Sequence, residues 1–210
     1  RLRPPLPSCE ARLRFAPTMN IRTYIDDELR IRPTSTEKLA VALQRERETL
    51  LAMRGEVERD PTTLNVSHLG RTLARLSDHL WLDGQRDEAL ALGGEALEIW
   101  EELGRDKAAY LQRLKLADYR ASVGDSSDLE ALDELVDEAS DEPLSVYRDF
   151  ALEALARSSF GAGDYERALD AIEGALDVRR ERGNETQIDE TETMRRTILA
   201  ARENNASETP

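Results

Sequence analysis

Three glycines recur at a nearly constant interval and constrain the fold more than any other feature of this chain. Gly84, Gly124 and Gly163 are separated by 40 and 39 residues. Each lies between two segments whose apolar residues follow helical spacing, where a backbone that reverses direction benefits from a residue without a Cβ. A single hairpin of two helices cannot bury its apolar face alone. The recurrence therefore predicts a stacked array of helical hairpins.

The stretch 73–101 shows the repeating unit most clearly. Its first half places four residues at helical spacing, namely Leu73, Leu76, Ser77 and Leu80. Its second half, continued to residue 103, places five residues on one helical face, namely Ala89, Gly93, Ala96, Trp100 and Leu103. A constant offset of 79 residues relates Leu73, Leu76, Ser77 and Ala89 to Leu152, Leu155, Ala156 and Ala168. The offset indicates two copies of one supersecondary unit.

The composition favours an all-α fold and excludes several classes of partner. Leu, Ala, Glu and Arg dominate the 210 residues, aromatic residues make up only 5%, and the strand formers Val, Ile and Thr are scarce. A net charge of −14 lacks the basic footprint that nucleic-acid binding needs, and it disfavours anionic membrane surfaces. Cys9 is the only cysteine, so no disulfide can form within the chain. With no apolar run near the length of a membrane span, we expect a cytoplasmic protein.

Helix start and stop signals divide the chain into about seven or eight helices. Residues 1–33 are expected to be a mostly disordered N-terminal extension, with a short helix over 21–30 and Met19 as a candidate translation start. Residues 34–203 are expected to form the repeat domain, and residues 204–210 a disordered tail. Within the domain we predict hairpins over 60–104, 105–141 and 142–182, with flanking helices over 34–58 and 186–203.

Two of the repeats resemble the tetratricopeptide repeat family. The third copy matches the family pattern at Leu152, Leu155, Ala156, GDYERAL (163–169) and Ile172. The first copy matches it at Leu73, Leu76, Ser77, Leu80, DGQRDEAL (83–90) and Ala96. The middle copy departs, because Arg113 and Arg120 stand where the family has large apolar groups. The long period and EALEIWEELG (95–104) are similar to the extended repeats of the kinesin light chain type.

The resemblance implies a right-handed superhelical array of antiparallel hairpins, a TPR-like α-solenoid. It also implies that the first helices line a concave groove, which binds a peptide or helix of another protein. Carried over by position, the lining residues are Arg71, Ala74, Asp78, Trp81 and Leu82, then Leu111, Leu114 and Asp118, and finally Phe150, Glu153, Arg157 and Phe160. Trp81 and Phe160 occupy equivalent places, and either they anchor a partner or they pack between helices. The family's carboxylate clamp is not expected, because it needs Lys and Asn where Ala74 and Asp78 stand.

Six carboxylates form a second candidate site on the helix predicted over 127–141. They recur at i, i+3, i+4, i+7, i+8 and i+11 as one carboxylate ridge, made of Glu130, Asp133, Glu134, Asp137, Glu138 and Asp141. Such a ridge is either a solvated helix face or a docking strip for a Lys- or Arg-rich segment of a partner.

The sequence offers few groups for catalysis or for metal binding. His68 and His79 are the only histidines, and 11 helical residues place them about 16 Å apart, too far to share an ion. No phosphate-binding loop or zinc motif is present. We therefore expect no cofactor and no enzymatic activity, and we favour an adaptor or scaffold. The alternatives are a regulatory or sensing segment of a larger signalling system, or an acidic TPR-type chaperone for a secreted substrate. The oligomeric state stays open.

Overall fold

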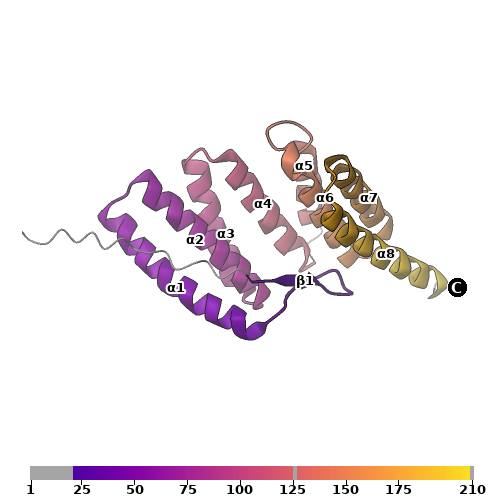
Figure 1. Ribbon diagram of the computed structural model, residues 1–210, viewed down its shortest axis with the longest axis horizontal. Helices are drawn as coiled ribbons and strands as arrows, with labels where there is room; N and C mark the ends of the chain where they lie inside the picture. Colours follow the sequence, from indigo (N-terminus) through magenta and orange to yellow (C-terminus); the bar gives the residue numbers. More distant parts are fainter. Residues whose placement is uncertain (1–20, 125–126, 209–210) are drawn as a thin grey trace, which may run out of the picture.

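A computed structural model describes residues 21–124 and 127–208, and this part of the chain folds almost entirely into helices (Figure 1). The predictions for residues 1–20, for Met19 as a start and for residues 209–210 lie outside it. The elements are β1 (Thr23–Ile25), β2 (Ile31–Pro33), α1 (Thr36–Arg59), α2 (Thr63–Leu82), α3 (Arg86–Glu102), α4 (Asp106–Ala121), α5 (Ser127–Glu138), a 3-10 turn (Ser145–Tyr147), α6 (Arg148–Gly161), α7 (Tyr165–Arg182) and α8 (Glu185–Glu208).

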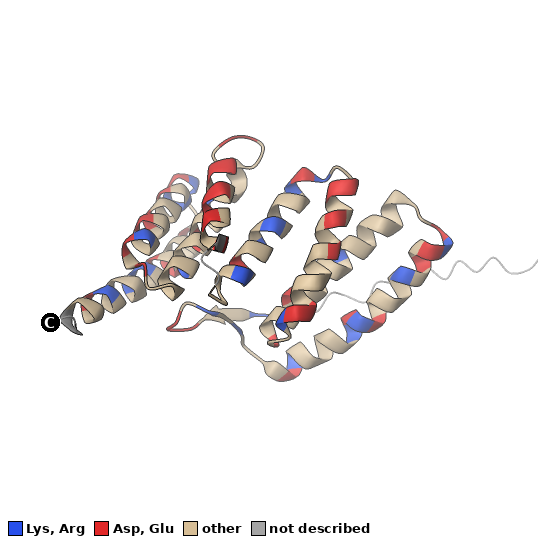
Figure 2. Ribbon diagram, turned by 180° about the vertical axis from the view of Figure 1, so that it is seen from behind, with Lys and Arg blue, Asp and Glu red and all other residues tan. Residues whose placement is uncertain are grey.

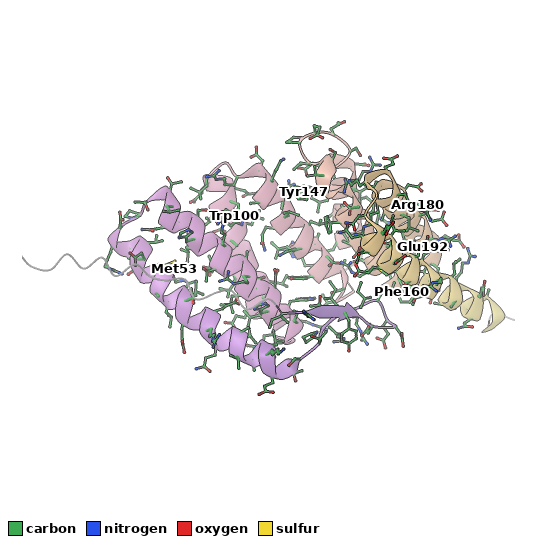
Figure 3. All side chains as sticks on the ribbon, in the orientation of Figure 1. Met53, Trp100, Tyr147, Phe160, Arg180 and Glu192 are labelled. Carbon is green, nitrogen blue, oxygen red and sulfur yellow. The ribbon has the colours of Figure 1, made fainter. Side chains whose placement is uncertain are left out.

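The eight helices of the described chain pack as sequential antiparallel neighbours in a solenoid-like array (Figure 1). The pairs α2–α3, α4–α5 and α6–α7 correspond to the three predicted hairpins. The helices α1 and α8 pack against the two ends, on α2 and α7. Across the α7–α8 contact, Arg180 and Glu192 form an ion pair of 3.0 Å, and Figure 3 shows the two side chains close together. The predicted all-α array is confirmed.

The three recurring glycines lie at the bends between paired helices, as predicted. Gly84, Gly124 and Gly163 have φ angles of 83°, 100° and 79°. This left-handed region costs a residue with a Cβ roughly 1–2 kcal/mol, so glycine is the natural choice at each bend. The period read from the sequence is therefore the period of the hairpins, since each of these glycines lies between the two helices of one hairpin.

Small residues allow the helices to approach closely. A Cβ added to Gly93 of α3 would lie 2.8 Å from a Leu116 methyl carbon and 2.9 Å from the Ser77 hydroxyl. The Ser77 hydroxyl also donates a hydrogen bond of 2.7 Å to the carbonyl of Ala89, a residue with no exposed surface. One apolar cluster forms among α1, α2 and α3, and a second forms among α4 to α8.

The short helix predicted over residues 21–30 is wrong, because this segment forms an antiparallel β-hairpin. Strands β1 and β2 pair with Tyr24 opposite Arg32. Between them, one carboxylate oxygen of Asp26 accepts hydrogen bonds from the amides of Glu28 at 3.0 Å and Arg30 at 2.8 Å. A side chain that satisfies turn amides in this way competes with helix formation, which explains the error.

Two predicted helix boundaries also differ from the structure. The helix expected to start beside Pro143 begins only at Arg148, because the amides of Leu144 and Ser145 bond to the Asp141 carbonyl in a separate turn. The last helix continues to Glu208, beyond the predicted end at residue 203. Residues 204–208 contain no Pro or Gly to stop it, and polarity alone does not end a helix.

Candidate interaction site

The helices α2, α4 and α6 form one surface of the array, which we call the first-helix face. The residue six positions before each recurring glycine is charged, namely Asp78, Asp118 and Arg157. Each of these side chains contacts a residue of a neighbouring first helix. Asp78 forms an ion pair with Lys115 and accepts a hydrogen bond of 2.9 Å from the Tyr119 hydroxyl. Asp118 forms an ion pair of 2.8 Å with Arg157. The face is therefore joined by a carboxylate contact at each helix-to-helix step.

The same type of contact joins α1 to α2. Glu46, which is buried, forms an ion pair with Arg75 and lies 2.8 Å from Nδ1 of His79. Arg75 and Lys115 both stand nine residues before their glycines, while His79 and Tyr119 both stand five before. The 40-residue period already relates Arg75 to Lys115 and His79 to Tyr119, although none of these four residues was among the predicted binding residues. His79 thus contributes to helix packing.

The charges at the centre of the face are satisfied within the protein. Burial disfavours the Arg157 charge, but the carboxylates of Asp118 and Glu153 outweigh this effect and raise the pKa of Arg157. Glu153 contacts Arg157 at 2.7 Å and also Arg179 of α7 at 2.6 Å. Burial, followed by the nearby Asp78 carboxylate, raises the pKa of Tyr119 well above its usual value. The raised pKa values favour the charged form of Arg157 and the neutral form of Tyr119, so both side chains keep the states that their contacts in the face require.

Both aromatic rings proposed as anchors have packing partners. Trp81 of α2 stacks on Tyr119 of α4, with ring centroids 4.3 Å apart and planes 6° apart. Arg86 lies over the Trp81 ring at 5.7 Å. Phe160 makes an edge contact of 5.8 Å with Tyr165 of the next helix. Helix packing therefore accounts for both rings without a partner.

Three predicted lining residues occupy one equivalent position on the first helices, and we call them the outer row. This outer row stands thirteen residues before each glycine and consists of Arg71, Leu111 and Phe150. Arg71 is exposed, Leu111 is half-buried and Phe150 is 44% exposed, whereas the neighbouring Leu114 is buried. The guanidinium of Arg179 lies 5.8 Å from the centre of the Phe150 ring. The outer row therefore offers a cation and apolar surface to a partner.

The β-hairpin crosses the array near the other ends of these helices. We call residues 21–34 the strap. Figure 1 draws β1 beside the lower ends of α2 and α4, and β2 contacts α2. Ile21 packs against the first apolar cluster, and Leu29 at the tip of the strap is 3% exposed within the second. The sequence analysis missed the strap, although TYI and IRP on either side of an acidic turn are a hairpin signal.

Leu29 has an unusual backbone conformation for a branched side chain. Its φ of 54° lies in the left-handed region, where a three-residue hairpin loop usually has Gly or Asn. The conformation costs about 1–2 kcal/mol, and full burial of the side chain contributes about 1.5–3 kcal/mol. Leu29 therefore contributes only a small net free energy to the attachment of the strap.

Five members of the carboxylate ridge lie on α5, Asp141 follows the end of this helix, and ion pairs neutralise part of the ridge. Asp133 forms an ion pair with Arg167 of α7. Glu138 accepts two hydrogen bonds from Arg113 of α4, at 2.7 and 2.9 Å. The other four members are exposed and form no ion pair within residues 21–124 and 127–208, namely Glu130, Glu134, Asp137 and Asp141. Figure 2 shows acidic residues on α3 and α5, with basic residues on α4 between them.

The described residues contain no group of three or more histidines, cysteines and carboxylates placed to hold a metal ion. No helix among them combines the length and the apolar character that crossing a membrane requires. A comparison of the chain with protein-family models and with curated proteins finds no match to either.

Proposed function

We propose that this chain is a non-enzymatic interaction module, an adaptor or scaffold, that binds a peptide or helix of a partner protein on the first-helix face. The outer row carries the proposal, because Arg71, Leu111 and Phe150 leave charge and apolar surface open on the first helices of three successive hairpins. The inner positions of the same face are already paired with one another. The resemblance to tetratricopeptide repeats supports the same use of this face.

Affinity capture from native lysate tests the outer row. Arg71→Glu combined with Phe150→Ala should remove a specific prey, because both side chains are accessible. Within residues 21–124 and 127–208, Phe150 contacts Arg179 and Arg71 forms no ion pair. Leu51→Ala is the matched control, since Leu51 of α1 is 73% exposed and lies off the face. Retention of the prey by the double variant would reject the outer row as the binding surface. Trp81→Ala is a poor probe, because loss of the stack on Tyr119 would itself disturb the array.

A second candidate function is electrostatic docking of a basic segment on the carboxylate ridge. The four exposed carboxylates without an ion pair in the described chain favour it, as does the net charge of −14. Glu134→Lys with Asp137→Lys should weaken capture of a basic prey, most strongly at low salt. Asp170→Lys on α7 is the control for a change of net charge. Capture that is insensitive both to these substitutions and to salt would exclude the ridge.

A further inference from the structure

The strap is a self-contained unit with respect to polar contacts. Within the described chain, its hydrogen bonds and ion pairs all join strap residues to one another. Asp26 binds Arg30 and Arg32 through its second carboxylate oxygen, and Thr34 closes the base on the Arg22 carbonyl at 2.9 Å. The strap can therefore leave the array without breaking a polar contact to a helix.

Attachment of the strap to the second apolar cluster rests on one side chain. Leu29 is buried there, whereas Tyr24, Ile25 and Ile31 of the same hairpin are 53%, 36% and 37% exposed. A hairpin that needed only to turn would have Gly at the Leu29 position. The array instead holds a branched aliphatic side chain there in an unfavourable backbone conformation, and such outliers gather at ligand clamps and switches.

We propose that the strap is the chain's own occupant of a continuation of the first-helix face, and that a partner segment with one branched aliphatic side chain at a turn takes the place of Leu29. The inference rests on the proposed function and deepens it, since it names the class of anchor and a step of release. The strap itself shows the chemistry that the site accepts, which is a hairpin turn presenting a leucine to the cluster that contains Leu114 and Ala117.

The strap sequence supplies a direct probe. A fluorescent peptide of residues 21–34 is titrated into the full chain as wild type, Leu29→Gly and Leu29→Asp. Leu29→Gly keeps the turn and removes the anchor, and Leu29→Asp also opposes burial. We expect the peptide to bind both variants at least about tenfold more tightly than the wild type, because the wild-type site is occupied. The same peptide carrying Leu29→Asp should lose this affinity.

Equal binding to wild type and variants would overturn the proposal, and so would equal binding of the two peptides. Absence of binding to all three proteins at about 1 mM peptide would overturn it as well. Circular dichroism checks each fold, and Leu29→Gly serves if Leu29→Asp unfolds. The titration contains no partner protein, so it can succeed even where capture through the outer row fails.

Hydrogen exchange of the wild-type protein gives a second measurement. The amides of Asp26 and Arg30 should exchange faster than those in the middle of α4, and their exchange should report opening of the strap while the helices stay folded. If the strap amides and the α4 amides exchanged at one common rate, the strap would open only when the helices unfold, and the proposal that it is released alone would be rejected. Strap protection that falls on dilution, with a dimer by light scattering, would assign the strap to a second copy and overturn it too.

Discussion

The strap and the helical array differ in how they are held, although both contain ion pairs. In the array, polar contacts run between helices, as from Asp118 to Arg157 and from Glu153 to Arg179. In the strap, polar contacts join strap residues to one another, as from Asp26 to Arg32. Leu29 is the strap residue that packs in the second cluster. Loss of an inter-helix contact should therefore weaken the whole array, while loss of a strap contact should stay local. The predictions below test this difference, beginning with the largest expected effect.

Ala168→Arg should unfold the array. Ala168 has no exposed surface and packs in the second apolar cluster, so a guanidinium there would be overpacked and without a partner. We expect a loss of more than about 4 kcal/mol in the free energy of unfolding, measured by thermal and urea denaturation. Asp170→Arg, exposed on the same helix, should leave the melting temperature nearly unchanged. A stable Ala168→Arg protein would contradict the hairpin packing itself.

Arg157→Met should cost about 2–4 kcal/mol, because it leaves the Asp118 carboxylate without its cation and removes one of the two arginines that contact Glu153. The value lies toward the lower end for a buried pair, since both carboxylates keep some contact with water. Arg202→Met breaks the exposed ion pair with Glu166 and should cost no more than about 0.5 kcal/mol. If urea denaturation gave similar losses of unfolding free energy for the two variants, the ion pairs of the first-helix face would stabilise the protein no more than an exposed ion pair does.

Leu29→Gly should change global stability by less than about 1 kcal/mol, because lost burial is offset by relief of the left-handed conformation. Exchange at the strap amides should nevertheless rise strongly, while exchange in the middle of α4 stays constant. Hydrogen exchange followed by mass spectrometry measures both at once. Faster exchange throughout α4 in this variant would show that the strap and the array form one cooperative unit.

Acid should loosen the strap by protonating Asp26. Partial burial acts to raise the pKa of Asp26, but the Arg30 amide and the Arg32 and Arg30 side chains outweigh it and lower this pKa below its ordinary 3.8. The ionised form therefore stabilises the strap above that value, and the contribution is lost as the pH falls through the lowered pKa. NMR signals of the Leu29 methyl groups should report the change. Asp26→Asn should show a loosened strap already at neutral pH, and a pH response like the wild type would exclude Asp26 as its cause.

The helical array could be predicted because its causes are local and repeated. Gly84, Gly124 and Gly163 meet the same backbone requirement at each bend, and the small residues Ala89 and Gly93 mark the close approach of neighbouring helices. Period and spacing were sufficient for these features. The choice of partner for each long polar side chain was not predictable. Asp118 and Arg157, for example, are 39 residues apart, and only the stacking of the hairpins brings them into contact.

The amino-acid sequence by itself determined that this chain forms stacked helical hairpins that repeat about every forty residues. Helix periodicity and glycine conformation depend on only a few neighbouring residues, so they can be read from the sequence. Only the tertiary structure decided which predicted site residues stay open and which are paired inside. The fold of residues 21–34 was also decided by the tertiary structure, because an isolated two-strand hairpin is marginally stable in water and needs a surface to pack on. The array provides that surface at the cluster that receives Leu29.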